Sequence, residues 1–258
     1  MRTLDLFDLH GKVAIVTGGA AGIGRQMAEG LAELGADLVL GARKAERCVR
    51  VAAELAGSTG VRVVGIGCDV ADPEQVEAMV ATAVDRFGRV DVLVNNAGTT
   101  WAAPAEAMRL EDWRKVLDVN LTGAFLCCQS AGRVMIGQGS GKIVNIASVA
   151  GLGGSPPELM DTVGYNASKG GLITLTRDLA VKWARHGINV NGIAPGWFPS
   201  RMSGWTLEHH SDTLSQFIPL RRFGGPHDLK GAVAYLASAA SDYVTGHVLV
   251  VDGGTSAY

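Results

Sequence analysis

The sequence predicts an α/β protein in which helices cover both faces of a parallel sheet. Short runs rich in Val, Ile and Leu alternate with longer amphipathic stretches along the 258-residue chain. Crossovers that contain helices join parallel strands and place those helices on both faces of the sheet. A glycine-rich turn, TGGAAGIG, joins the first strand-like run to the first helical stretch. No Pro/Ser-rich linker or fixed-period repeat divides the chain, so we expect one domain over residues 1–258.

Each element follows from its hydrophobic period and from the residues at its ends. Strand-length β-branched runs predict seven strands, at residues 12–18, 37–43, 61–69, 90–98, 141–148, 188–196 and 247–254. Helical periodicity predicts helices at residues 22–35, 45–57, 73–87, 110–135, 165–185 and 226–239. Residues 198–217 have the weakest pattern, and we expect a small inserted substrate lid there.

Composition and charge narrow the function classes. Apolar residues make up 47% and charged residues 19% of the chain, as in a protein with a large buried core. The net charge of −2, without a basic cluster, argues against nucleic acid or an anionic membrane as partner. The N-terminal MRTLDLFDLHGK is too polar for a signal peptide and no apolar run approaches a membrane span, so we expect a cytoplasmic protein.

The cysteines and histidines do not predict a metal site. Cys48, Cys68, Cys127 and Cys128 lack the spacing of zinc ligands and are expected to be buried free thiols. The two adjacent histidines of the lid region are more typical of a solvated polar stretch than of metal ligands.

The glycine-rich turn indicates a phosphate-binding site. Gly18, Gly22 and Gly24 let the chain turn tightly after the first strand and bring the backbone close to a pyrophosphate. Together with Ile23 they open the first helix, whose N-terminus favours negative charge. The spacing differs from G-x-G-x-x-G, and a tight turn without a ligand is the alternative. The position between the first strand and first helix favours a dinucleotide.

The residues after the second strand distinguish NAD(H) from NADP(H). NAD-binding proteins of this type place Asp or Glu there to hold the ribose 2′-hydroxyl. In this chain Ala42 is followed by Arg43 and Lys44, and a guanidinium binds a 2′-phosphate with a fork of donors, so NADP(H) is favoured. The alternative is that Arg43 begins a solvated helix. Ala20 and Ala21 weaken the prediction, because the glycine turn has no basic residue.

Four polar residues are expected to lie near the ends of the middle strands. Ser148 ends the fifth predicted strand, and Tyr165 and Lys169 lie one turn apart at the start of the next helix. Asn120 lies inside the long helix that follows the fourth strand. A Tyr-x-x-x-Lys pair alone is a weak signal, but ligands bind at the carboxyl ends of strands in such sheets.

Together these motifs resemble the short-chain dehydrogenase/reductase family. The matching segments are TGGAAGIG, CDV, NNAG, DVN, IAS, YNASK, INVNGIAPG and TGHVLVVDGG, which span residues 17–254. Within the family, NNAGTTW and PGWFPSRM look closest to bacterial NADPH-dependent 3-oxoacyl (β-ketoacyl) reductases. The resemblance implies a single Rossmann-type doubly wound domain with strand order 3-2-1-4-5-6-7. It also implies an oxidoreductase that transfers hydride reversibly between a nicotinamide and a carbonyl or secondary alcohol.

The resemblance implies a role for each catalytic residue. Tyr165 would be the general acid in reduction and the base in oxidation, with its phenolate favoured by the Lys169 ammonium. Ser148 would hydrogen-bond the substrate oxygen. Lys169 would also hold the nicotinamide ribose, and Asn120 would hold a water that passes protons toward solvent.

The implied cofactor site draws on the glycine turn, the ends of the second to fourth strands, the catalytic helix and the segment after the sixth strand. Its residues are Gly18, Gly22, Ile23, Gly24, Arg43, Lys44, Asp69, Val70, Asn96, Ala97, Gly98, Tyr165, Lys169, Pro195, Gly196, Phe198 and Ser200.

Large apolar side chains in the segments expected around the nicotinamide predict an apolar ketone or alcohol as substrate, such as a 3-oxoacyl compound. The candidates for the substrate site are Trp101, Gly153, Trp197, Met202 and Trp205. The alternative is that some of these side chains pack the lid or an oligomer interface.

The segment between Ser148 and Tyr165 departs from the family pattern. Tyr165 follows Ser148 by 17 residues, whereas the interval in most relatives is roughly thirteen. The extra length falls in GGSPPELMDT and is expected to bulge over the substrate side without moving the catalytic residues. A neutral surface insertion is the alternative, because lengthening a loop costs little free energy.

Two other functions stay open on the sequence. One is a sugar or gluconate-type dehydrogenase with the same mechanism, and the other is a cofactor-binding protein that has lost catalysis. A serine hydrolase is excluded, because Ile146 and Ala150 stand where a nucleophile elbow has glycine. The resemblance implies a homotetramer or a homodimer.

Overall fold

A single sheet organises the chain. The computed structural model describes residues 2–257, and its sheet has seven parallel strands in the order β3-β2-β1-β4-β5-β6-β7. The strands are β1 (Val13–Thr17), β2 (Asp37–Ala42), β3 (Val63–Gly67), β4 (Val92–Asn95), β5 (Gly141–Ile146), β6 (Ile188–Pro195) and β7 (Val248–Val251). The predicted fold class and strand order are therefore confirmed.

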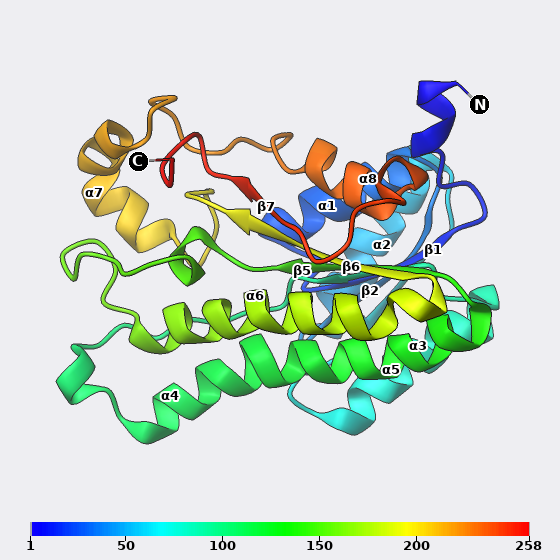
Figure 1. The fold of residues 1–258 in the computed structure, drawn as a ribbon, viewed down its shortest axis with the longest axis horizontal. Helices are drawn as coiled ribbons and strands as arrows, with labels where there is room; N and C mark the ends of the chain where they lie inside the picture. The colour runs from blue at the N-terminus through cyan, green and yellow to red at the C-terminus, as the bar shows by residue number, and fades with distance from the viewer. Residues whose placement is uncertain (1, 258) are drawn as a thin grey trace.

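Helices cover both faces of this sheet, as Figure 1 shows. They are α1 (Gly22–Glu33), α2 (Ala45–Thr59), α3 (Pro73–Phe87), α4 (Leu110–Leu117), α5 (Gly123–Gln138), α6 (Val163–Trp183), α7 (Gly204–Phe217) and α8 (Lys230–Ala237). Helices α1, α2 and α8 pack on one face, and α3, α5 and α6 pack on the other. None of the helices within residues 2–257 is long and apolar enough to span a bilayer.

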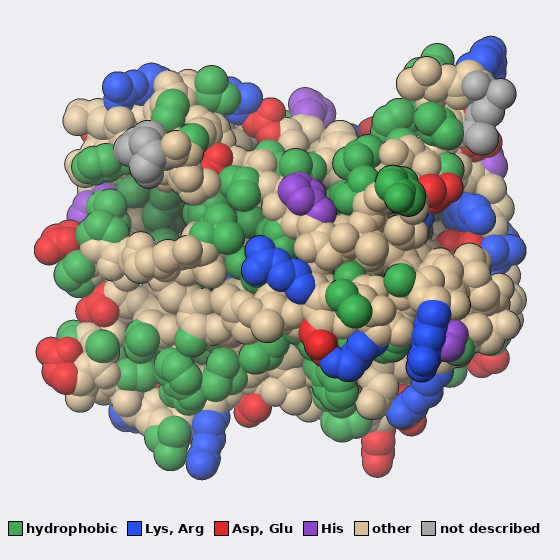
Figure 2. Space-filling view, in the orientation of Figure 1, with side chains coloured by type: hydrophobic (Ala, Val, Ile, Leu, Met, Phe, Trp, Pro, Cys, Tyr) green, Lys and Arg blue, Asp and Glu red, His purple; other side chains and the backbone are tan. Residues whose placement is uncertain are grey.

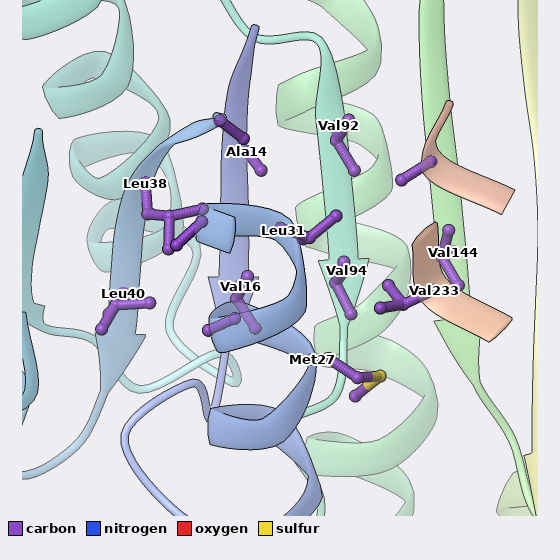
Figure 3. Packing of buried hydrophobic residues seen from close by; sticks show 14 of the residues in the cluster. Ala14, Val16, Met27, Leu31, Leu38, Leu40, Val92, Val94, Val144 and Val233 are labelled. Carbon is purple, nitrogen blue, oxygen red and sulfur yellow. The ribbon is translucent and has the colours of Figure 1, made fainter. Parts of the chain in front are cut away.

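The inner strands are apolar on both sides because both faces of the sheet are covered. All five residues of β1 are buried, and consecutive side chains enter opposite cores. Figure 3 shows Ala14 and Val16 of β1 beside Met27 and Leu31 of α1. Ile15 lies in the opposite core with the side chains of α3 and α5. Continuous burial explains why these strands read as unbroken apolar runs rather than as alternating ones.

Three of the predicted helices differ from the observed ones. The helix expected over 110–135 is divided into α4 and α5 by a π-helical turn, Asp118–Thr122. The last predicted helix, 226–239, is shortened to α8 (Lys230–Ala237). The helix expected over 165–185 is α6 (Val163–Trp183), which begins two residues earlier and is followed by a short 3₁₀ turn.

The region expected to be a patternless lid contains a helix, α7. Only Leu214 of this helix is buried, and the backbone leaves helical geometry at His210. A helix with so little buried surface has no apolar stripe, which explains why periodicity did not reveal it. Whether the segment 198–217 acts as a lid stays a prediction.

Asp91, the residue directly before β4, joins three segments at the amino end of the sheet. Its carboxylate accepts hydrogen bonds from Val13 N at 3.0 Å and from two nitrogens of Arg89 at 2.7 Å. Its backbone oxygen accepts from Lys142 N of β5 at 2.8 Å. The Asp91 side chain is 7% exposed, so little water can replace these partners. The carboxylate therefore holds β1 and β4 in register.

We predict that Asp91→Ala lowers the free energy of unfolding by about 3 kcal/mol, because it leaves a buried amide and a guanidinium without their acceptor. Urea denaturation measures the loss. Asp178→Ala is the matched control, since Asp178 pairs with Lys182 on the exposed surface. A change below about 0.5 kcal/mol is expected there. Equal losses in the two variants would contradict the structural role of Asp91.

Candidate active site

The candidate active site lies at the carboxyl ends of β1, β4 and β5. Strand β1 pairs with both β2 and β4, so the direction in which the chain adds strands reverses there. Such a switch point opens a crevice at the carboxyl ends of the strands, where open α/β sheets bind ligands. Helix α6 enters from the β5 side and carries Tyr165 and Lys169 into the region.

Lys169 is a buried cation. Its residue surface is 4% exposed, and Nζ donates a hydrogen bond to the backbone oxygen of Ile146, the last residue of β5, at 2.7 Å. Nζ lies 5.5 Å from the centroid of the Tyr165 ring. Burial disfavours the charged form and lowers the pKa of Lys169 from 10.5 to about 8. The ammonium is thus still charged at neutral pH.

The Tyr165 ring lies beside this cation, and the Ser148 hydroxyl is near enough to act on the pKa of Tyr165. Burial raises the pKa of Tyr165 above its usual value of 10, and the hydrogen bond with Ser148 partly opposes that rise. Without cofactor, Tyr165 is therefore protonated at neutral pH. Ser148 also accepts a hydrogen bond from Ala150 N at 3.2 Å, which directs its hydroxyl group as the chain leaves β5.

The long segment between Ser148 and Tyr165 leaves this pair together. At Gly151 the segment passes so close to α6 that a Cβ would lie 2.6 Å from the Lys169 carbonyl carbon. Farther along, Ser155 accepts a hydrogen bond from Asn166 at 3.0 Å, and the Asp161 oxygen accepts one from Ala103 N at 2.9 Å. The insertion is thus attached to α6 and to the loop after β4. Its influence on substrate choice stays a prediction.

Asn120 lies in the π-helical turn rather than within a regular helix. Its Oδ1 accepts from Thr99 N at 2.7 Å, and its Nδ2 donates to Thr99 O at 2.9 Å and to Ser168 Oγ at 3.0 Å. Ser168 Oγ in turn donates to Tyr165 O at 2.7 Å. Both amide hydrogens of Asn120 are therefore used. A water could therefore bind Asn120 only by donating a hydrogen bond to one of its oxygen atoms. That Asn120 holds such a water stays a prediction.

A chain of buried polar side chains connects α6, the helix that carries Tyr165 and Lys169, to the sheet. Asn95 Nδ2 donates to Asn145 Oδ1 at 2.9 Å, and Asn145 Nδ2 donates to Thr176 Oγ1 of α6 at 2.9 Å. Asn95 and Asn145 are register partners in β4 and β5, and Asn145 directly precedes Ile146. Asn145 and Thr176 are 0% and 1% exposed. This chain, which we call the amide ladder (Asn95, Asn145, Thr176), ties α6 to the two strands that end at the site.

The glycine turn is shaped largely by Asn96. Asn96 Nδ2 donates to Thr17 O at 2.9 Å, and the Thr17 hydroxyl accepts from the backbone nitrogens of Asn96 and Ala97 at 3.0 Å each. A Cβ on Gly24 would lie 2.2 Å from Asn96 Nδ2, and one on Gly18 would lie 2.7 Å from the same atom. These two glycines therefore allow β1 and β4 to be joined, beyond any approach to a phosphate. Sequence reasoning missed Thr17, although a hydroxyl at the end of β1 was visible.

The N-terminus of α1 fits a phosphate group. Its N-cap, Ala21, offers no side-chain acceptor, so the first amides of the helix have no capping partner. Gly22 has φ +51 and is exposed, and a Cβ added there would have the Ser200 Cβ, at 3.7 Å, as its nearest neighbour. Ile23 follows at the partly buried second position of the helix. The first amides of α1 and the positive end of its helix dipole therefore face open space.

The remaining cofactor candidates of the first four strands differ in exposure. Arg43 and Asp69 line a pocket of about 480 Å³ beside α4, and Lys44 is exposed as the N-cap of α2. Val70 is buried and packs against Gly123, while Gly98 lies near both Asn120 and Lys169.

The segment after β6 is less uniform than the sequence suggested. Pro195 is buried at the end of β6, and Gly196 passes close to Asp252. Phe198 belongs to the apolar core and packs against Gly224, so its backbone is the part left for a cofactor. Ser200 exchanges hydrogen bonds with Ser203 at 3.0 and 3.2 Å.

The predicted substrate residues do not share one described cavity. Trp197 lines a pocket of about 160 Å³ that includes none of the other four. Trp101, Met202 and Trp205 are exposed by 39%, 42% and 66%, and Gly153 faces open space. In Figure 2 apolar side chains gather on the left of the molecule, beneath α7 and beside the loops there. Their role in substrate binding stays a prediction.

We predict that Lys169→Met abolishes turnover yet stabilises the fold at pH 7 by about 2 kcal/mol, since it removes a buried charge. In the native protein the folded-state pKa is lower than the unfolded one, so the unfolded chain binds more protons between pH 8 and 10.5. The stability of the native protein should therefore rise with pH in that window, and the advantage of the variant should shrink. Urea denaturation across this window measures both proteins. A constant difference would contradict burial of the charge.

We predict that Thr176→Val lowers the free energy of unfolding by about 2 kcal/mol, because the buried Asn145 amide loses its acceptor while the side-chain shape is kept. Turnover should fall as well, since α6 carries Tyr165 and Lys169. Thr176→Ser keeps the hydroxyl group and is the control that should restore turnover. If Val and Ser variants turn over alike, the amide ladder does not position α6.

Comparisons with known proteins agree with this geometry. A family model described as enoyl-(acyl carrier protein) reductase matches residues 18–256. The chain is 39% identical to a 3-oxoacyl-[acyl-carrier-protein] reductase of Synechocystis sp., over 95% of this chain and 97% of that protein. It is 40% identical to a 5-keto-D-gluconate 5-reductase of Escherichia coli, over 97% of each.

A solved structure has a similar level of sequence identity to this chain. The gluconate 5-dehydrogenase of Burkholderia cenocepacia, in complex with NADP and tartrate, superposes with a TM-score of 0.94 at 39% identity and 100% coverage of both chains. The family match covers nearly the whole chain, and the similar proteins are dehydrogenases and reductases that act on alcohol or carbonyl groups. The chain is therefore an oxidoreductase that belongs to the short-chain dehydrogenase/reductase family.

Proposed function

We propose that the protein is an NADP(H)-dependent reductase of apolar ketones, such as 3-oxoacyl compounds, with Tyr165 as proton donor. The observation that carries this proposal is the buried Lys169 ammonium, whose Nζ lies 5.5 Å from the centroid of the Tyr165 ring, with the Ser148 hydroxyl acting on the pKa of Tyr165. A protonated phenol, a hydrogen-bond donor and a cation in one place are what protonation of a carbonyl oxygen needs.

Each residue contributes a separate step. Ser148 binds the carbonyl oxygen and orients it toward Tyr165. Tyr165 donates its proton to that oxygen, and Lys169 stabilises the phenolate that forms. The Lys169 charge is weakly hydrated because the side chain is buried, which strengthens its effect on the phenolate. The nicotinamide of the bound cofactor supplies the hydride. The N-terminus of α1 and Arg43 would hold the phosphate groups of the cofactor.

The preference for NADP(H) rests on Arg43. Its guanidinium forms no hydrogen bond or ion pair with any residue in the described range 2–257, and it lines the pocket beside β2. A free guanidinium at the end of β2 favours a 2′-phosphate over a bare ribose hydroxyl. The gluconate 5-dehydrogenase structure that this chain resembles holds NADP, which agrees with the proposal.

The proposal for an apolar substrate rests on Trp101, Met202 and Trp205, which are exposed in the segments that follow β4 and β6. A sugar-acid substrate is the second candidate, because two of the similar proteins are named for gluconate or ketogluconate. Both substrates, the apolar ketone and the sugar acid, would use the same proton transfer from Tyr165. A comparison of substrates therefore separates the two but does not test the mechanism.

We predict that a panel of ketones, tested with NADPH and NADH, gives the highest kcat/KM for 3-oxoacyl thioesters with NADPH. Tyr165→Phe should lower kcat by roughly 10²–10⁴-fold, because it removes the proton donor. Tyr243→Phe is the control, since Tyr243 is fully exposed. A faster reaction with 5-ketogluconate would replace the substrate proposal, and an unchanged kcat in Tyr165→Phe would overturn the mechanism.

A further inference from the structure

A second arginine faces the pocket that Arg43 lines. This pocket of about 480 Å³ is bounded by Arg43 and Asp69 on the side of β2 and β3. On its other side it is bounded by α4 and the π-helical turn, which contribute Arg114, Lys115 and Asp118. Two segments separated by about seventy residues in sequence thus present guanidinium groups to one space.

Three of the other four charged residues around the pocket, Asp69, Glu111 and Lys115, have contacts of their own, and Asp118 is the fourth. Glu111 is bound by Arg109 at 2.7 Å, and the Asp69 carboxylate accepts from Ala71 N at 3.1 Å. The Lys115 ammonium lies over the Trp101 ring, 5.6 Å from its centroid.

Within residues 2–257 the guanidinium groups of Arg43 and Arg114 form neither a hydrogen bond nor an ion pair. Asp118 lies one turn from Arg114 on the same pocket, yet no ion pair joins them in that range. Two unpaired cations that share a pocket repel each other and are stabilised together by an anion between them. A phosphate monoester, with three acceptor oxygens and close to two negative charges, suits two guanidinium forks.

We propose that Arg114 is a second ligand of the 2′-phosphate of NADP(H), opposite Arg43. The proposal rests on the NADP(H) preference proposed above and adds a specificity residue from α4. It also explains why the glycine turn has Ala20 and Ala21 instead of a basic residue, since the second cation comes from across the pocket. Lys115, held over Trp101, has no part in this contact.

The test uses isothermal titration calorimetry on the cofactor-free protein with two probes that differ only in the 2′-phosphate, adenosine 2′,5′-bisphosphate and adenosine 5′-monophosphate. Arg114→Ala and Arg43→Ala should each weaken bisphosphate binding roughly tenfold and leave monophosphate binding within about twofold. Arg114→Lys, which keeps the charge without the fork, should lose less affinity than Arg114→Ala. Arg50→Ala, an exposed arginine of α2 outside this pocket, should bind both probes as the native protein does.

Several outcomes separate this proposal from the proposed function. If Arg43→Ala weakens bisphosphate binding and Arg114→Ala does not, the role of Arg114 is wrong and the NADP(H) preference stands. If Arg114→Ala weakens both probes equally, Arg114 contacts the adenosine or the 5′-phosphate, and its 2′-phosphate role is again wrong. If the native protein binds both probes equally, the NADP(H) preference fails and the Arg114 proposal falls with it, while the Tyr165 mechanism still stands on its own kinetic test.

Discussion

The hydrogen bond from the buried Lys169 ammonium to the Ile146 carbonyl is the contact on which the geometry of the candidate active site depends. It joins α6 to the last residue of β5 and places a charge where water is scarce. A buried charge is costly unless its donors are satisfied, so the strand end and the helix must keep their relative position. Tyr165 lies one turn before Lys169 on α6, and Ser148 lies two residues after the end of β5. The contact between Lys169 and Ile146 therefore brings Tyr165 and Ser148 to the same place.

The rest of the fold maintains that contact. The amide ladder holds α6 against β4 and β5 below the site, and Asn120 holds the loop after β4 beside Ser168 of α6. Gly151 allows the segment after Ser148 to lie directly on the Lys169 backbone. These polar links are buried and specific, whereas the apolar layers on the two faces supply stability without directing any one side chain. Local polar bonds therefore set the geometry that the sheet makes possible.

The sequence predicted the sheet and its strand order correctly, and the structure brings the candidate catalytic residues Ser148, Tyr165 and Lys169 to one end of β5. Both follow from patterns that a chain displays locally. Continuous apolar runs mark strands buried on both faces, and strand ends reveal which polar residues share an edge. It did not predict the π-helical turn at Asn120, since that turn depends on bonds to Thr99 and Ser168, which are distant in sequence. It did not predict α7 either, because a helix with one buried residue shows no periodicity. The sequence did not indicate Arg114 for a related reason, because only the folded pocket places this residue opposite Arg43.

The proposed mechanism requires a Lys169 side chain that is charged, buried and weakly hydrated in the folded protein. It is tested most directly by ¹³C NMR of protein labelled at the lysine Cε carbons, titrated from pH 6 to 11 without cofactor. One of the seven lysines should titrate near pH 8, and its signal should be missing from the Lys169→Met spectrum. If no lysine titrates near pH 8, the Lys169 ammonium is well hydrated, and the proposed support for the Tyr165 phenolate is contradicted.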